Sequence, residues 1–230
     1  MWRQLLFILC VQGLLTSPVY ADNTAETGLA TALALAAPDA DPDVLQLAQQ
    51  AMACAVAAGM PSSERLAVID YSRPSTTPRL WIFDLGQRTL LFHELVAHGR
   101  NSGDNITTTF SNQPGSNASS LGLFVGQETY EGEHGYSMRM DGLEPGFNDK
   151  ARERYIVMHG ASYVDEAVSE KLGRLGRSLG CPAVRSGVAH RIIDTLKGGQ
   201  FVFSYYPDAQ WLSESRFLNC QGTIGRMSGR

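Results

Sequence analysis

The chain has 230 residues, of which 43% are hydrophobic and 18% are charged. This balance is ordinary for a globular protein with a buried core, and the length suits one large domain with a short preface. The formal net charge is −4, and the sequence contains no long basic run. The charge pattern therefore indicates neither a nucleic acid nor an anionic membrane as the partner.

The N-terminal segment has the pattern of a cleavable export signal. Arg3 precedes an apolar run over residues 5–15, and small residues stand just before Asp22. An N-terminal membrane anchor is the alternative, but the run is shorter than the roughly 20 residues of a spanning helix. We expect residues 1–21 to be a signal peptide cut after Ala21. The mature chain would then be periplasmic or otherwise exported, without stable membrane insertion.

A leader and a helix are expected next, over residues 22–62. Residues 22–42 are rich in Ala, Thr and Asp and predict a mobile leader that is helical in part. Residues 43–58 carry an apolar face at helical spacing, with Asp41 or Asp43 as the cap and Gly59 at the end. This helix should pack on the outside of the main domain, which we place at residues 63–208.

From Leu66 onward the pattern changes to short segments rich in β-branched and aromatic residues. The segments expected to be strands are 66–71, 79–84, 89–98, 121–126, 136–140, 155–158 and 201–206. Helices are expected at 164–172 and 184–196, a long surface loop at 101–119 and a C-terminal tail at 209–230. The order favours a mainly β fold with flanking helices, either a mixed sheet or a β-sandwich, over a doubly wound α/β fold.

Three cysteines follow the expected cleavage site: Cys54, Cys181 and Cys220. An odd number leaves at least one thiol without a partner in the chain, and an exported address favours disulfide formation. If one disulfide forms, we expect it between Cys54 and Cys220, which would leave Cys181 free. The alternative is that Cys54 is only a small apolar residue of its helix.

Cys181 lies in a glycine-rich loop and is the candidate nucleophile. Gly180 would let a substrate approach closely, and Pro182 suits the first position of the helix expected at 184–196. A helix N-terminus would stabilise a thiolate, and the backbone N–H groups of Gly180 and Cys181 could hold an oxyanion. The alternative is an inert, buried cysteine in a tight turn.

His159 is the candidate base, because it ends a short apolar strand and Gly160 should open space beside it. Ser178 would orient the imidazole or line the site. Together with Cys181, these residues outline a thiol nucleophile with its base.

The remaining histidines do not indicate a metal site. His93, His98, His134 and His190 show neither the HExxH motif nor another paired-ligand spacing. We therefore expect no metal and no cofactor. His134 is expected either in the cleft or in an exposed loop.

These residues also carry a resemblance. His159-Gly160 followed by Ser178-Leu179-Gly180-Cys181 resembles the signature of the YkuD-type L,D-transpeptidases, bacterial cell-wall enzymes with a catalytic cysteine. The sequence is most similar to the branch called the murein L,D-transpeptidase catalytic domain family. Further similar segments lie at 98–103, 119–122, 132–137 and 142–149, and the resemblance spans residues 66–206. It implies a YkuD-like β-sandwich.

The sequence departs from the commoner YkuD pattern at two positions. Leu179 and Ala183 stand where that pattern has a histidine before the Gly-Cys pair and an arginine after the cysteine. His159 is then the expected base, and another residue must hold the substrate carboxylate. The candidates for that role are Arg177, Arg185, Arg139 and Arg152.

The resemblance implies an acyl transfer on peptidoglycan stem peptides. Cys181 would attack the tetrapeptide stem next to its terminal D-alanine, and an amine of a second stem would take the acyl group to form a 3→3 cross-link. The expected substrate-binding residues are Gly160, Arg177, His134, Tyr163 and Arg185. Two alternatives are water as the acceptor, giving an L,D-carboxypeptidase or endopeptidase, and a non-catalytic peptidoglycan-binding module.

Overall fold

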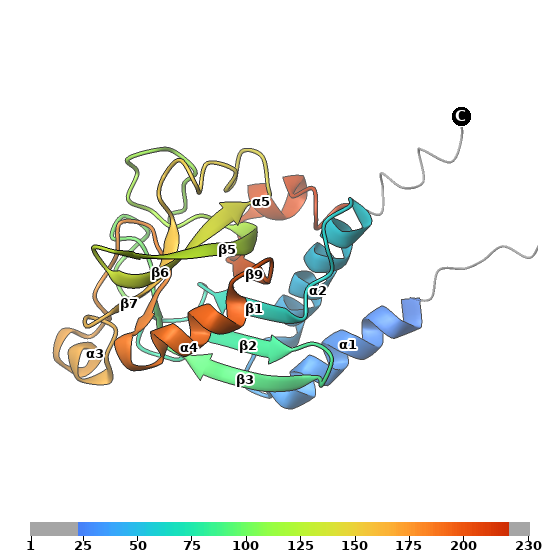
Figure 1. The fold of residues 1–230 in the computed structure, drawn as a ribbon, viewed down its shortest axis with the longest axis horizontal. Helices are drawn as coiled ribbons and strands as arrows, with labels where there is room; N and C mark the ends of the chain where they lie inside the picture. Colours follow the sequence, from blue (N-terminus) through green and yellow to red (C-terminus); the bar gives the residue numbers. More distant parts are fainter. Residues whose placement is uncertain (1–22, 221–230) are drawn as a thin grey trace, which may run out of the picture.

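The computed structural model describes residues 23–220 (Figure 1). The expected signal peptide lies outside these residues. Within them, the chain forms a curved sheet with helices on both of its faces.

The centre of the fold is one mixed sheet of nine strands. The strands are β1 Arg65–Asp70, β2 Leu80–Asp84, β3 Thr89–Glu94, β4 Val96–Ala97, β5 Gly122–Gly132, β6 Gly135–Gly142, β7 Val157–Ala161, β8 Ala183–Arg185 and β9 Phe201–Tyr205. Their order is β3-β2-β1-β9-β5-β6-β7-β8-β4, with β1–β9 and β7–β8 parallel and the other pairs antiparallel. The expected mainly β fold with a mixed sheet and flanking helices is confirmed.

The sheet curls until it is nearly a barrel. Strands β3 and β4 lie at opposite ends of the strand order, yet Leu95 alone separates them in the sequence. The two edges must therefore approach each other at this residue. The prediction of a single strand at 89–98 was wrong, because the segment forms two strands that lie at opposite edges of the sheet.

In the described residues, two large apolar cores lie on the two faces of the sheet, and a smaller third cluster forms around Leu95, Val164 and Leu175. Successive side chains of a strand point to opposite faces. Accordingly Leu66 and Val68 of β1 join one core, whereas Ala67 and Ile69 join the other. All four are buried, which explains why this strand reads as a continuous apolar run. Cys181 belongs to the second core.

Five helices flank the sheet within residues 23–220: α1 Asn23–Ala36, α2 Pro42–Ala57, α3 Glu166–Leu172, α4 Ser186–Leu196 and α5 Ala209–Glu214. Helices α1 and α2 pair on the side of β1, β2 and β3 (Figure 1). Asp41 caps α2 by accepting a hydrogen bond from the N–H of Asp43 at 2.9 Å. Leu33 and Ala37 are fully buried, so the part of the leader around them is packed on the core, contrary to expectation.

Helix α4 covers the second core. Its buried residues Ala189, Ile192, Ile193 and Leu196 follow the spacing of one helical face. The helix begins later than expected, because residues 183–185 first form β8. Cys181 and Pro182 therefore precede a strand and not a helix, and a helix dipole does not explain the reactivity of the thiol.

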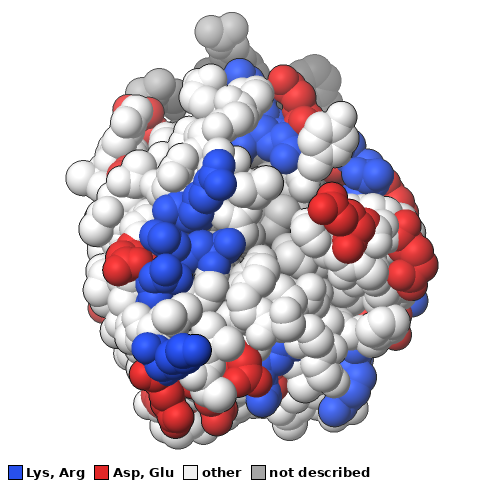
Figure 2. Space-filling view, turned by 90° about the vertical axis from the view of Figure 1, so that its left-hand side faces the viewer, with Lys and Arg blue, Asp and Glu red and all other residues white. Residues whose placement is uncertain are grey.

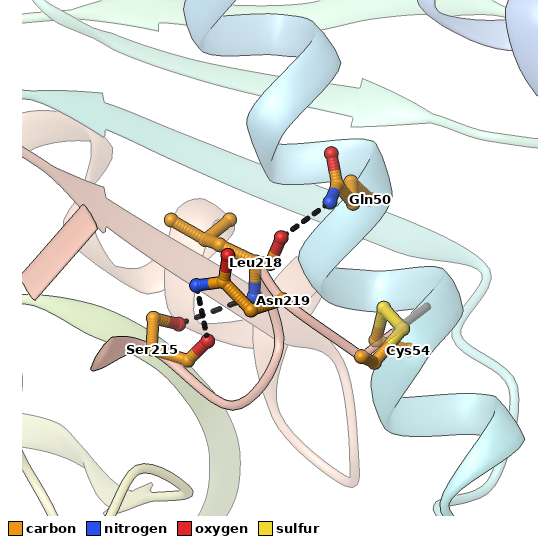
Figure 3. The surroundings of a disulfide bond; sticks show 6 residues. Gln50, Cys54, Ser215, Leu218 and Asn219 are labelled. Atoms are coloured by element: carbon orange, nitrogen blue, oxygen red, sulfur yellow. Dashed lines mark hydrogen bonds between the residues drawn. A yellow bond between two sulfur atoms is a disulfide. The ribbon is translucent and has the colours of Figure 1, made fainter. Parts of the chain in front are cut away.

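The segment expected to be a C-terminal tail is ordered and packed as far as residue 220. Trp211 of α5 is fully buried, and its indole N–H donates to the Glu144 carboxylate at 3.0 Å. A disulfide joins Cys54 of α2 to Cys220, the pair expected from the sequence. Beside it, the amide of Gln50 donates to the carbonyl of Leu218 at 2.5 Å (Figure 3). These contacts hold the C-terminal segment against α2.

None of the helices in residues 23–220 is both long and apolar enough to cross a membrane.

Candidate active site

The thiol of Cys181 lies at the end of a tight loop that leads into β8. It is the free cysteine among the described residues, since Cys54 and Cys220 form the disulfide. Gly180 has a φ of +125°, and a Cβ there would lie 2.9 Å from the carbonyl oxygen of Ala118. Only glycine fits this position without strain.

Ser178 shapes this loop from within. Its hydroxyl donates to the carbonyl of Cys181 at 2.6 Å and accepts from the N–H of Gly180 at 3.1 Å. The sequence suggested that Ser178 orients the imidazole or lines the site. The observed bonds instead give it a role in fixing the loop that presents the thiol.

The segment 98–103, one of those that carried the resemblance, lies against the loop. Gly99 bridges to Ser178, and a Cβ at Gly99 would lie 2.9 Å from the Cα of Gly180. Ser119 supports the loop from the side, because its hydroxyl donates to the carbonyl of Gly180 at 3.2 Å. Two segments that carried the resemblance are therefore structural supports of the nucleophile loop.

The thiol itself contacts the chain just before β7. The N–H of Val157 donates to the Cys181 Sγ at 3.4 Å, and the thiol donates to the carbonyl of Tyr155 at 3.7 Å. Burial raises the pKa of the Cys181 thiol, whereas the Val157 N–H and the charge of Arg154 act to lower it. Tyr155 has a φ of +55° and is 76% exposed. It therefore belongs to a turn, and the expected strand 155–158 starts only at Val157.

His159 lies on β7, which runs parallel to β8 and pairs His159 with Ala183. Its Nδ1 lies 3.0 Å from the carbonyl oxygen of Gly160, so Nδ1 carries the proton and donates. This bond leaves Nε2 as the basic nitrogen. Burial lowers the pKa of His159, which keeps the imidazole neutral at neutral pH.

Cys181 lies two residues before β8, which pairs with the strand β7 that carries His159. Val157, which contacts the thiol, and His159 stand two positions apart on β7 and so share a face of the sheet. No hydrogen bond joins His159 to Cys181 anywhere in the described part of the chain. In unliganded enzymes such bonds are often long and tighten only when substrate binds.

Gly160 does not open space beside the imidazole, contrary to expectation. A Cβ at this position would lie 2.9 Å from the Cβ of Ala189, so Gly160 lets α4 pack directly on β7. Its contribution to the site is its carbonyl group, which holds the Nδ1 of His159.

His134 covers the base. It comes from the exposed turn between β5 and β6, and its ring stacks on that of His159 with centroids 4.4 Å apart. The His134 charge contributes to the lowered pKa of His159. As a result, His159 is only 1% exposed and His134 faces the open side of the site.

A cavity of about 380 Å³ opens over the thiol. Several polar and aromatic side chains surround this cavity. The lining residues are Gly115, Asn117, Tyr130, Glu133, His134, Arg154, Tyr155, Val157, Leu179 and Cys181. Glu133 lies in the segment 132–137 that carried the resemblance, whereas Arg154 is one of several charged residues between positions 150 and 154 and had no motif to mark it.

The four arginines proposed as carboxylate anchors each have an acidic partner instead. Arg185 forms two hydrogen bonds with Glu94 and lines a different cavity, next to α4. The other three arginines also form ion pairs: Arg177 with Asp104, Arg139 with Glu128, and Arg152 with both Glu128 and Asp141. None of the four arginines lines the cavity over the thiol.

Tyr163 packs behind the loop and not in the cavity. Its side chain fills the space next to Gly176, where a Cβ would lie 2.4 Å from the Tyr163 Cβ. Burial raises its pKa to about 12, and the proximity of Cys181 adds to this effect.

The end of the molecule that carries α3 is strongly basic in places. Figure 2 shows Lys and Arg side chains gathered in an elongated ridge on this face. In the loops next to the nucleophile, Arg174 and Arg177 both contact Asp104, and Arg177 also donates to the carbonyl of Arg100. Both of these arginines are thus paired with an acidic residue.

Within residues 23–220, no three His, Cys, Asp or Glu side chains are grouped so that they could hold a metal ion.

The family model for the L,D-transpeptidase catalytic domain matches residues 36–205. The chain belongs to this family. A search of curated proteins found no significant match.

Among solved structures, this L,D-transpeptidase domain is similar to an L,D-transpeptidase from Mycobacterium smegmatis. The two are 13% identical, with a TM-score of 0.38, over 63% of this chain and 60% of the other. It is also similar to Bd1075 of Bdellovibrio bacteriovorus, at 14% identity and a TM-score of 0.40, over 72% of this chain and 56% of the other. The matches thus cover less than two thirds of these proteins.

Proposed function

We propose that this protein is an exported, cysteine-dependent L,D-transpeptidase that acts on peptidoglycan stem peptides through a thioacyl-enzyme on Cys181. The observation that carries the proposal is the free Cys181 thiol on the wall of a cavity of about 380 Å³. A neutral imidazole with a defined basic nitrogen lies on β7, the strand that pairs with β8. Membership of the family and the expected signal peptide support the same interpretation.

In the first half of the reaction, the Nε2 of His159 takes the proton of the Cys181 thiol. The thiolate attacks the carbonyl that precedes the terminal D-alanine of a tetrapeptide stem. The C–N bond breaks as the imidazolium returns its proton to the leaving amine. D-alanine leaves, and the acyl group remains on sulfur as a thioester.

The oxyanion of the tetrahedral intermediate needs N–H donors that are free of other partners. The N–H of Gly180 already donates to Ser178. Of the two donors expected from the sequence, we therefore assign this role to the N–H of Cys181. Such a donor typically contributes about 3 kcal/mol to the stability of the transition state.

In the second half, the amine of another stem attacks the thioester and loses a proton to His159. The C–S bond breaks as the imidazolium returns a proton to the Cys181 sulfur, which gives a 3→3 cross-link and the free thiol. Water at the same position would give an L,D-carboxypeptidase or endopeptidase. The open cavity of about 380 Å³ is compatible with a second peptide stem, and we propose the amine as the acceptor.

The test uses purified protein with a disaccharide-tetrapeptide, scored for D-alanine release and for cross-linked dimer. We expect both products, and we expect the Cys181→Ala variant to form neither. A Cys54→Ser/Cys220→Ser double variant is the matched control, since it removes two sulfurs but leaves Cys181. D-alanine release without dimer would contradict the transpeptidase function and indicate a carboxypeptidase. Wall binding without either product would leave only a binding module.

A further inference from the structure

The guanidinium of Arg154 lies between the thiol cavity and the segment 111–120. It lines the same cavity as Cys181. A Cβ at Gly180, the neighbour of the nucleophile, would lie 3.3 Å from its Nη2. The side chain therefore reaches the nucleophile loop from a turn that precedes β7.

All four N–H groups on the two terminal nitrogens of Arg154 donate to neutral oxygens of this segment. Nη1 donates to the carbonyl of Ser111 at 2.6 Å and to the hydroxyl of Ser120 at 2.5 Å. Nη2 donates to the carbonyl of Ala118 at 2.6 Å and to the hydroxyl of Ser116 at 3.1 Å. The position of the charge is thus fixed by the protein.

No ion pair joins Arg154 to a carboxylate of the described residues, whereas Arg139, Arg152, Arg177 and Arg185 each have one. A half-buried cation without a counter-ion is costly, because it has lost part of its hydration. Burial indeed lowers the pKa of Arg154, and the nearby Cys181 opposes that effect. The thiolate of Cys181, which forms when the thiol ionises, would supply the missing counter-ion of Arg154.

The thiol needs such a charge. Cys181 is 9% exposed, and burial by itself disfavours a thiolate. Leu179 and Ala183 carry no charge that could stabilise the thiolate. Helix α4 begins only at Ser186, so the thiol does not lie at its N-terminus. Besides His159, the proposed base, the titratable side chains that face the thiol or its cavity are Tyr71, Tyr130, Glu133, His134, Tyr155 and Tyr163. Arg154 is the permanent cation of this group.

We propose that Arg154 is a positioning residue that stabilises the thiolate of Cys181 electrostatically, using a fixed charge supplied from outside the nucleophile loop. Its terminal N–H groups are fully engaged, so it does not serve as the anchor of the substrate carboxylate. This inference builds on the proposed function, yet it concerns the thiol alone and can be tested without a peptide substrate.

The experiment is the pH dependence of Cys181 alkylation by iodoacetamide, followed by mass spectrometry of the Cys181 peptide in the full chain. The variants are Arg154→Gln, which keeps hydrogen-bond donors without the charge, and Arg154→Lys, which keeps the charge. Arg152→Gln is the matched control, because Arg152 lies two positions away but is paired with Glu128 and Asp141. Circular dichroism and thermal unfolding verify the fold of each variant.

We expect Arg154→Gln to move the alkylation midpoint upward by about one pH unit or more, because an opposite charge at close range shifts a pKa by that amount. Arg154→Lys and Arg152→Gln should remain near the wild-type midpoint. An unchanged midpoint in Arg154→Gln would overturn the proposal. So would an equal shift in Arg154→Lys, since the hydrogen bonds and not the charge would then control the thiol.

Two further outcomes separate this inference from the proposed function. A raised KM for the tetrapeptide in Arg154→Gln with an unchanged alkylation midpoint would assign Arg154 to substrate binding and contradict the proposal. A shifted midpoint in a protein that releases no D-alanine would support the role of Arg154 and refute the transpeptidase function.

Discussion

Removal of the Cys54–Cys220 disulfide should destabilise the protein strongly without changing the site. The two cysteines are 166 positions apart in the sequence. A cross-link over so long a loop removes much conformational entropy from the unfolded chain, about 5 kcal/mol in the chain-entropy model. Measured effects are commonly about 2–4 kcal/mol, so we expect a loss within this range for the Cys54→Ala/Cys220→Ala double variant.

The assay is urea unfolding of the double variant and the wild type, followed by tryptophan fluorescence. Trp211, which is buried beside the C-terminal segment, provides a local signal. Neither α2 nor the segment after α5 contributes a residue to the lining of the thiol cavity. Alkylation of Cys181 in the folded variant should therefore match the wild type. An unchanged free energy of unfolding would refute the reasoning, as would a disulfide-dependent change in Cys181 reactivity.

Two predictions concern the surroundings of the thiol and the base. Ser178→Ala leaves the buried N–H of Gly180 and the carbonyl of Cys181 without their partner, so the free energy of unfolding should fall by about 1–3 kcal/mol and D-alanine release should slow. Thermal unfolding measures the first effect and steady-state kinetics the second. Wild-type values in both would contradict the role of Ser178 in fixing the loop. His134→Ala should raise the pKa of His159, because the substitution removes a like charge and a covering ring. NMR titration of the His159 imidazole should show the higher pKa, and the acidic limb of the pH–rate profile should shift to higher pH. A lower pKa of His159 in the variant would contradict this prediction.

The sequence led to the nucleophile and the base because both stand in short motifs with a chemical meaning. Cys181 follows glycine in a loop, and His159 follows the apolar run 155–158, although the strand β7 continues beyond it to Ala161. The odd number of cysteines after the expected cleavage site also led to the Cys54–Cys220 pair. These inferences depend on local spacing and on counting, both of which a single sequence supplies.

Features that depend on closure of the sheet could not be predicted in this way. The break at Leu95 sends β3 and β4 to opposite edges, and no propensity of residues 89–98 marks it. Residues 183–185 continue the helical pattern of α4 but pair with β7 as β8, because the parallel neighbour is available only in the folded sheet. Tertiary pairing outweighed local preference in both places.

The role of Arg154 was likewise hidden, because its hydrogen-bond partners lie in the distant segment 111–120. Arg139, Arg152, Arg177 and Arg185 were predicted as carboxylate anchors, but each forms an ion pair that the sequence does not reveal. Only the fold shows which cation stays unpaired and lies beside the thiol.

The most direct test of the proposed function is mass spectrometry of the intact protein during reaction with the disaccharide-tetrapeptide. We predict a mass increase equal to the tetrapeptide donor minus D-alanine, located on the Cys181 peptide after digestion and absent in Cys181→Ala. Acyl modification at another residue, or D-alanine release by the Cys181→Ala variant, would contradict the central claim that Cys181 forms the thioacyl-enzyme.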